Sequence, residues 1–126
     1  MGFAAPGTVG GHAEAQALDY LLRRGLHEVT RNFRSRGGEI DLVMLDGDCI
    51  VFIEVRYRKS TRFLSPATTV DGRKQRKILR TAALFLSRHS HYANHTVRFD
   101  VVAITGDGER RVNWLRDAFR PMDSTL

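Results

Sequence analysis

Two neighbouring segments rich in apolar residues, at positions 39–45 and 49–56, most strongly constrain what this chain can fold into. Isoleucine, leucine, valine and phenylalanine dominate both segments, and most of these residue types favour extended strands. Only Asp46-Gly47-Asp48 separates the two. A short connection containing Asp-Gly between two such segments is a strong sign of a β-hairpin. The sequence therefore predicts an antiparallel strand pair near the middle of the chain.

Helices and further strands are predicted on both sides of this hairpin. Small and apolar residues at helical spacing predict a helix over residues 10–24, which Gly25 ends in a left-handed conformation. A second helix is predicted over residues 71–88, with Asp71 as its N-cap. Residues 57–70 are polar and contain Ser-Pro, which is typical of a loop. Strands are predicted at residues 27–33, 96–105 and 112–115.

The order of these elements indicates the fold class. A helix lies between the third and fourth strands, and such a crossover joins strands that run parallel in one sheet. We therefore predict an α/β fold with a mixed β-sheet of about five strands, flanked by helices. A chain of 126 residues has room for one domain. Residues 1–126 are predicted to form that domain, with short flexible tails at both ends.

Composition narrows the class of protein. Cys49 is the single cysteine, so no internal disulfide can form, and we expect a reducing compartment and hence a cytoplasmic protein. No apolar segment approaches the ~20 residues of a membrane span. The first basic residue is Arg23, so the N-terminal segment is not expected to be a secretory signal peptide.

The predicted hairpin brings carboxylates together on one face. Side chains alternate along a strand, so Glu39, Asp41 and Val43 are expected on one face and Ile40, Leu42 and Met44 on the other. If Gly47-Asp48 is the turn, Asp41 lies opposite Glu54 and Glu39 lies opposite Arg56. A turn at Asp46-Gly47 shifts the register by two residues and keeps the faces, whereas a three-residue loop would separate the carboxylates.

Two such carboxylates about 5 Å apart repel each other by roughly 3 kcal/mol at an effective dielectric constant of 20. A bound divalent cation offsets this repulsion, and Mg²⁺ uses one or two protein carboxylates together with water and substrate phosphate. The alternative is a structural network in which Arg56 neutralises Glu39 and Glu54 at the sheet surface. The pattern alone leaves both interpretations open.

Each predicted helix places polar side chains toward the sheet. Around the axis of the first helix, Glu14 projects between Ala17 and Leu18, and so it lies on the apolar face. Either it interacts with the helix dipole in the first turn, or it reaches the same carboxylates. Lys74 and Gln75 face inward at the N-terminus of the second helix, where phosphate groups are readily bound.

Positive charge is concentrated in residues 56–80. This window has nine basic residues and one acid, hence a net charge of +8 in a chain whose net charge is +6. With Tyr57 and Phe63 in or beside the predicted loop, it is suited to nucleic-acid backbone contacts and to base stacking. The basic residues are Arg56, Arg58, Lys59, Arg62, Arg73, Lys74, Arg76, Lys77 and Arg80.

The arrangement of Asp41, twelve intervening residues and Glu54-Val55-Arg56 resembles the core of PD-(D/E)XK nucleases, whose usual third member is Lys. Longer stretches, covering nearly the whole chain in order, resemble the YraN-like family of predicted bacterial nucleases. These stretches are Gly11 to Glu14, Tyr20-Leu21 and Gly25; Arg31-Asn32-Phe33-Arg34; Gly38-Glu39-Ile40-Asp41-Leu42-Val43; Val51-Phe52-Ile53-Glu54-Val55-Arg56-Tyr57-Arg58; Lys74-Gln75; and Arg98-Phe99-Asp100-Val101-Val102.

The resemblance implies a restriction-endonuclease-like fold, similar to archaeal Holliday-junction resolvases, and divalent-metal-dependent cleavage of DNA phosphodiesters. In that core the Asp and the Glu hold the metal, which here implies Asp41 and Glu54, with the backbone carbonyl of Val55 completing the shell. The resolvases also use a Glu from the first helix, which implies Glu14.

Arg56 occupies the position of the usual lysine. Arginine stays protonated at ordinary pH, so it cannot act as a general base, but it can hold a phosphate and stabilise developing negative charge. Deprotonation of the attacking water is then left to the metal. Lys74 from the second helix is a candidate substitute for the missing lysine.

We therefore expect a Mg²⁺-dependent DNA endonuclease, with Mn²⁺ as a possible substitute and branched DNA or junctions among its substrates. Its catalytic residues are expected to be Glu14, Asp41, Glu54 and Arg56. Junction cleavage needs two symmetric active sites and hence a homodimer. The alternatives are a catalytically silent nucleic-acid-binding protein and an RNA-binding protein. The residues expected to contact nucleic acid are Arg58, Lys59, Arg62, Arg73, Lys74, Gln75 and Lys77.

Two other features are expected to be structural. Arg98 and Asp100 share a strand face and should form an ion pair. Cys49 has no His or second Cys nearby in sequence, so it is expected to be a small core residue.

Overall fold

The computed structural model of this protein describes residues 9–58, 70–107 and 109–121. Most of the regular elements begin and end close to the predicted positions. Their bounds are α1 (Val9–Arg23), β1 (His27–Ser35), β2 (Gly38–Asp46), β3 (Cys49–Arg58), α2 (Gly72–Arg88), the short 3-10 helix η3 (Ser90–Tyr92), β4 (Thr96–Asp107) and β5 (Glu109–Leu115).

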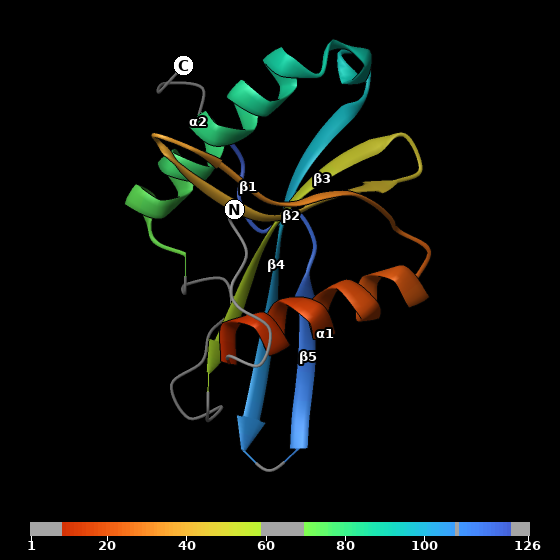
Figure 1. The fold of residues 1–126 in the computed structure, drawn as a ribbon, viewed down its shortest axis with the longest axis vertical. Coiled ribbons are helices and arrows are strands. Elements are labelled where there is room, and N and C mark those ends of the chain that lie inside the picture. Colours follow the sequence, from red (N-terminus) through yellow and green to blue (C-terminus); the bar gives the residue numbers. More distant parts are fainter. Residues whose placement is uncertain (1–8, 59–69, 108, 122–126) are drawn as a thin grey trace.

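The strands form one five-stranded sheet in the order β1-β2-β3-β4-β5 (Figure 1). β3 and β4 are parallel, whereas the other neighbouring pairs are antiparallel. The helix α2 connects the two parallel strands, as the crossover argument predicts. The predicted α/β fold with a mixed sheet flanked by helices is therefore confirmed.

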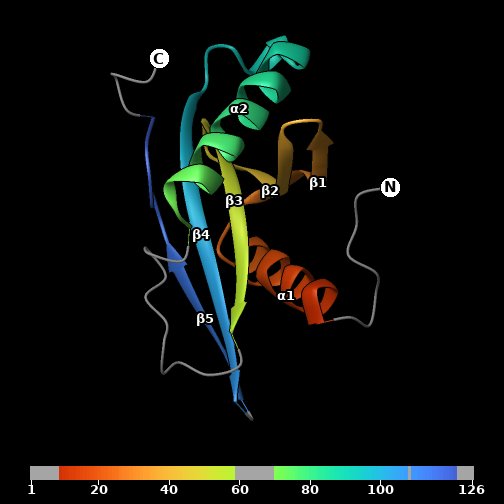
Figure 2. The ribbon, with the colours of Figure 1, turned by 90° about the vertical axis from the view of Figure 1, so that its left-hand side faces the viewer.

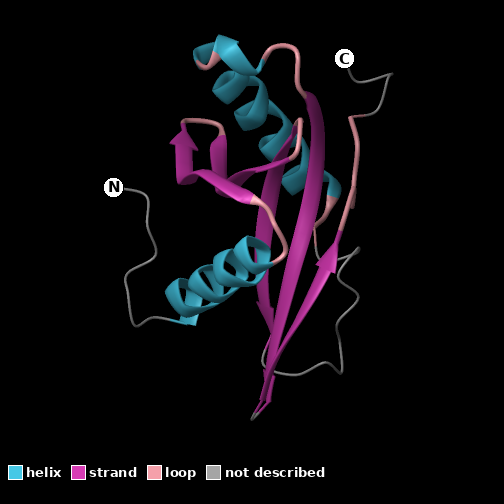
Figure 3. Cartoon of the chain, turned by 90° about the vertical axis from the view of Figure 1, so that its right-hand side faces the viewer, coloured by secondary structure: helices cyan, strands magenta, loops and turns pink. Residues whose placement is uncertain are grey.

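The two helices pack on opposite faces of the sheet (Figures 2 and 3). Alternate residues of β3 separate the faces: Val51 and Ile53 are buried with α1, whereas Ile50 and Phe52 are buried with α2. This is the alternation expected of a strand buried on both sides. Among the described residues, no helix has both the length and the apolar content needed to cross a membrane.

The hairpin between β2 and β3 has the predicted two-residue turn. Asp46 pairs with Cys49, so Gly47 and Asp48 form the turn, and Gly47 has a φ of +59°. A left-handed residue at the turn matches the twist of the flanking strands. The register that follows pairs Leu42 with Ile53. Extended by one residue, it places Asp41 opposite Glu54.

A capping side chain begins α2, and a glycine ends α1. Asp71 is the N-cap of α2, and its Oδ1 accepts a hydrogen bond from the backbone N–H of Lys74 at 2.9 Å. Gly25 follows α1 with a φ of +94°, which is the left-handed conformation predicted for it.

All five strands extend beyond the ranges that their sequence patterns indicate, and β3 and β5 show the reason. β3 continues to Arg58, where the pattern predicts a loop from residue 57, because β4 pairs with it as far as Arg58↔Thr105. β5 begins at Glu109, since it pairs with β4 over the whole of its length. Pairing in the sheet thus overrides the polar composition of these segments.

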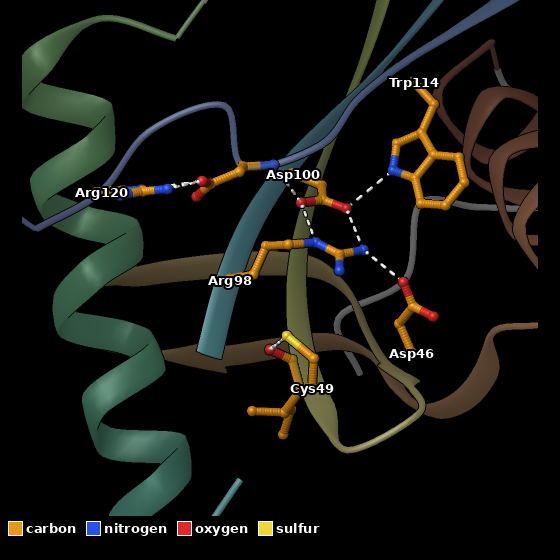
Figure 4. A network of polar contacts seen from close by, with 8 residues as sticks. Asp46, Cys49, Arg98, Asp100, Trp114 and Arg120 are labelled. Atoms are coloured by element: carbon orange, nitrogen blue, oxygen red, sulfur yellow. Dashed lines mark hydrogen bonds and ion pairs between the residues drawn. The ribbon is translucent and has the colours of Figure 1, made fainter. Parts of the chain in front are cut away.

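A buried ion-pair network joins the hairpin turn to β4 and β5 (Figure 4). Asp100 is completely buried and accepts hydrogen bonds from Arg98 Nε and Nη2 at 2.9 and 3.1 Å. Trp114 Nε1 and the backbone N–H of Asp117 donate to the same carboxylate at 2.9 and 2.8 Å. Arg98 Nη2 also donates to Asp46 Oδ2 at 3.0 Å. The ion pair expected between Arg98 and Asp100 is therefore confirmed.

Cys49 is half-buried against the core on the α1 side of the sheet. Its Sγ lies 3.7 Å from the backbone oxygen of Ile50 (Figure 4). This agrees with the expectation of a small core residue.

Replacement of Asp100 by asparagine is predicted to destabilise the protein by about 3 kcal/mol or more. The change leaves the half-buried guanidinium of Arg98 without its main counter-charge. Urea unfolding measures the difference. Asp19→Asn, which removes an exposed ion pair with Arg23 on α1, is the matched control and is expected to change the unfolding free energy by less than about 0.5 kcal/mol. Equal effects of the two changes would contradict the structural role assigned to Asp100.

Candidate active site

The candidate site lies where β2 and β3 separate. Their ladder runs from Asp46↔Cys49 to Leu42↔Ile53. Beyond it, the alternation of β2 breaks, because Leu42 is buried with α1 whereas Ile40 is buried with α2. The sequence pattern placed these two residues on the same face, so that prediction is wrong. Asp41 lies at the break, and we call this opening the β2–β3 split.

Asp41 directs its carboxylate into the β2–β3 split rather than onto one face of the sheet. Its Oδ2 accepts a hydrogen bond from the backbone N–H of Val55 at 2.8 Å. In a regular ladder that N–H would face Ile40, so the side chain of Asp41 replaces a backbone acceptor. The N–H and carbonyl of one strand residue point to the same edge. The carbonyl of Val55 therefore also faces the split.

Glu54 approaches the split from the α2 side of the sheet. Its side chain is 5% exposed, and its Oε2 lies 3.7 Å from Arg56 Nε and 3.3 Å from Lys74 Nζ. The carboxyl groups of Asp41 and Glu54 are in direct contact, and in its protonated form Asp41 donates a hydrogen bond to Glu54. The predicted meeting of Asp41 and Glu54 is thus present, with two cations on the Glu54 side.

Glu14 approaches from the α1 side. It is half-buried, forms a side-chain hydrogen bond with Asn32 of β1, and is close enough to Glu54 and Glu39 for their charges to act on it. Of the two interpretations of Glu14, the structure favours the one in which it reaches the carboxylates. We call Glu14, Asp41 and Glu54 the acidic cluster.

Burial and mutual repulsion alter the acidity of this cluster. Burial holds the pKa of Asp41 well above its ordinary value of 3.8, and the charges of Glu54 and Glu14 raise it further, while the Val55 N–H opposes the shift. Burial likewise raises the pKa of Glu14, and Glu39 and Glu54 add to the effect, while the hydrogen bond with Asn32 opposes it. The cluster therefore favours a bound proton or another cation.

The donor set fits a hard divalent cation. Asp41 and Glu54 supply carboxylate oxygens, and the carbonyl of Val55 faces the same opening. In the part of the chain that the structure describes, no three His, Cys, Asp or Glu side chains are already arranged to hold a metal ion. Two carboxylates are nevertheless sufficient for Mg²⁺, which fills its remaining positions with water and substrate phosphate.

The residues expected to contact nucleic acid have different surroundings. Arg58, Arg73 and Lys77 are exposed. Lys74 is half-buried and pairs with Glu54, and the side-chain amide of Gln75 donates to the carbonyl of Val70 at 2.9 Å. The predictions for Lys59 and Arg62, and for base stacking by Phe63, fall outside the described residues.

Sequence reasoning missed two neighbours of the site. Asn32 contacts Glu14 and was not identified as a site residue. Arg34 pairs with Glu39 across β1 and β2 at 3.5 Å, whereas Arg56 was the expected partner of Glu39. One sign of a special role for Asn32 was available in the sequence. Asparagine has a low β-propensity, yet this one lies in the middle of a predicted strand.

Comparison with known sequences identifies the family of this chain. Residues 13–104, which contain the acidic cluster, match the model of the Uncharacterised protein family UPF0102. The chain belongs to this family. A UPF0102 protein of Pseudomonas putida strain F1 is 48% identical over 121 residues, covering 94% of this chain and 98% of the relative. One from Stutzerimonas stutzeri strain A1501 is 51% identical over 111 residues, covering 87% and 92%.

Asp41→Asn is predicted to stabilise this UPF0102 chain at pH 7 in the absence of divalent cations. Burial and the neighbouring acids raise the pKa of Asp41, so its ionised form is disfavoured in the folded protein, whereas Asn carries no charge and retains an acceptor for the Val55 N–H. The folded protein holds the Asp41 proton more tightly than the unfolded chain does. The unfolding free energy of the wild type should therefore fall, relative to Asp41→Asn, as the pH rises from about 4 toward 7.

Denaturant unfolding at several pH values measures this difference. Asp46→Asn is the matched control on the same strand, because it removes the negative charge that faces Arg98 while keeping an acceptor, and it is expected to destabilise the protein slightly. A lower stability of Asp41→Asn at pH 7 without metal would contradict the assigned electrostatics.

Proposed function

We propose that this protein is a Mg²⁺-dependent endonuclease that hydrolyses DNA phosphodiesters. The observation that carries the proposal is the direct contact of Asp41 with Glu54 in the β2–β3 split, beside Arg56 and Lys74. Buried carboxylates next to cationic side chains provide sites for a divalent metal and for a phosphate at the same place. The resemblance to PD-(D/E)XK nucleases supports the same chemistry.

Asp41 and Glu54 would hold Mg²⁺ through their side chains, and Val55 would add its backbone carbonyl. The cation, when bound, lowers the pKa of a coordinated water and neutralises charge on the phosphate. Glu14, on the α1 side of the cluster, adds negative charge that favours the cation and provides an acceptor for a water proton.

Arg56 and Lys74 would act on the phosphate. Arg56 remains protonated, so it binds phosphate oxygens and stabilises the negative charge that develops during attack. Lys74 approaches Glu54 from α2, with its Nζ 3.3 Å from Glu54 Oε2. An ammonium group therefore lies beside the metal-binding glutamate even though β3 carries arginine at the usual lysine position. This supports a complete rather than a degraded site.

The exposed basic residues would bind the nucleic-acid backbone. Arg73 and Lys77 lie on the same helix as Lys74, and Arg58 lies at the end of β3, two residues beyond Arg56. Contacts of this kind are independent of sequence and weaken with increasing salt. The substrate class proposed from the resemblance is branched DNA or junctions, which requires a homodimer, and RNA is the competing substrate. We propose the cytoplasm as the location.

Asp41→Asn and Glu54→Gln are each predicted to abolish DNA cleavage while the Kd for DNA changes by less than about threefold, because these residues act on the metal rather than on the backbone. The assay uses linear, nicked and four-way-junction DNA with Mg²⁺ or Mn²⁺ at low salt. Asp48→Asn, in the exposed turn of the same hairpin, is the control. A wild-type protein that binds these DNAs and leaves all of them intact would refute the endonuclease.

Lys74→Met is predicted to lower kcat by about 10²- to 10³-fold, since it removes one charge that stabilises the transition state. Lys77→Met, on the exposed side of the same helix, removes the same charge from a position away from Glu54 and should alter only DNA affinity. Comparable losses of kcat in both variants would show that Lys74 acts only as a surface charge.

The competing candidate is a catalytically silent nucleic-acid-binding protein. One observation favours it: Glu54 already has Arg56 and Lys74 as counter-charges without a metal. Such a protein would bind DNA or RNA in a salt-sensitive way, and neither Mg²⁺ nor Glu54→Ala would alter the affinity. Arg56→Lys separates the candidates further, because a gain of cleavage in that variant would show that Arg56 limits an otherwise complete site.

A further inference from the structure

Asn32 has an unusual backbone conformation in the middle of β1. Its φ is +54°, and among the described residues Asp117 is the other non-glycine residue with a positive φ. Asparagine is one of the few residues that tolerate the left-handed region. The residue is also buried, with 8% of its surface exposed. A buried left-handed residue within a strand is maintained by its surroundings.

Asn32 lies directly across from Asp41. The register pairs Arg31 with Leu42 and Phe33 with Ile40, so Asn32 is opposite Asp41. Phe33 and Ile40 pack on the α2 side, whereas Leu42 packs on the α1 side. The regular alternation of faces therefore fails at this pair, and the left-handed residue of β1 lies beside the break in β2 that opens the β2–β3 split.

The side chain of Asn32 connects this pair to α1 through its hydrogen bond with Glu14. The side-chain amide can donate two hydrogen bonds, whereas a carboxylate only accepts them. Glu14 is otherwise exposed to the negative charges of Glu39 and Glu54, with Arg31 as the cation acting on it. The Asn32 amide and the charge of Arg31 thus both favour the Glu14 carboxylate next to two other acids, and of these two the hydrogen bond comes from Asn32.

We propose that Asn32 is the positioning residue for Glu14. Its side-chain amide holds the Glu14 carboxylate against the acidic cluster, and its left-handed backbone keeps β2 apart from β3 at Asp41. The inference rests on the proposed function, in which Glu14 assists beside the bound cation. Asn32 touches neither cation nor phosphate in this role, because it acts through Glu14.

Two replacements test the side-chain role of Asn32 while leaving its backbone able to stay left-handed. Asn32→Gly keeps the left-handed backbone at low cost and removes the amide. Asn32→Asp also tolerates the backbone conformation, but it replaces the donor with another carboxylate beside Glu14. The matched control is Asn113→Gly, which introduces the same glycine at an exposed position of β5.

The first measurement is structural and does not depend on catalysis. Crystal structures of the wild type and Asn32→Gly are compared without metal. We expect the register of β1 and β2 to be retained and the Glu14 carboxylate to leave the acidic cluster. A Glu14 carboxylate that keeps its position beside Asp41 and Glu54 in Asn32→Gly would overturn the proposal.

The second measurement is a double-mutant cycle with Glu14→Gln, with Mn²⁺ affinity from calorimetry and kcat on DNA as readouts. Asn32→Gly should weaken Mn²⁺ binding and lower kcat by about 10- to 100-fold, as removal of an orienting partner does at metal sites. In the Glu14→Gln background the same change should have no further effect, whereas independent, additive losses would overturn the proposal. Asn113→Gly should leave both readouts unchanged.

The two proposals fail separately. A wild-type protein that neither binds Mn²⁺ nor cuts any DNA refutes the endonuclease. In that case the crystal structures still decide whether Asn32 positions Glu14. The Glu14 carboxylate is displaced in Asn32→Gly if the proposal is right and keeps its position if the proposal is wrong.

Discussion

The site depends on one hydrogen bond, from the backbone N–H of Val55 to Asp41 Oδ2. A strand that leaves its neighbour exposes backbone donors, and each buried donor without a partner is costly. The carboxylate of Asp41 supplies an acceptor where the ladder ends. β2 can therefore separate from β3 inside the protein, and Glu14 and Glu54, which approach from opposite faces of the sheet, can meet at the opening.

The charges around this opening are divided unevenly. Glu54 has two cationic partners, whereas Asp41 has a backbone amide and two neighbouring acids, and burial together with these acids raises the pKa of Asp41. Folding this arrangement costs stability that an apolar pair at the same positions would not cost. Such a cost is typical of residues that are retained for binding or chemistry rather than for stability.

The sequence predicted the parts of the site that follow from local periodicity. The Asp-Gly turn set the register that brings Asp41 to Glu54, and the helical spacing of α2 placed Lys74 toward the sheet. The break at Asp41 could not be predicted, because strict alternation assigns Ile40 and Leu42 to one face. That break lies opposite the left-handed Asn32 of the neighbouring strand β1, so it belongs to the tertiary structure rather than to the local pattern. The same holds for the extension of β3 to Arg58, which results from pairing with β4.

The ion pair between Arg98 and Asp46 has a mechanical consequence for the hairpin. Asp46 is the last residue of β2 before the turn, and Arg98 joins it to β4, the strand on the far side of β3. The ion pair thus holds the turn end of the β2–β3 hairpin in a fixed position relative to β4. This ion pair resists any sliding of the two strands past each other. A change in the width of the opening would therefore require β2 to bend beyond Leu42, where its ladder with β3 ends and its ladder with β1 continues.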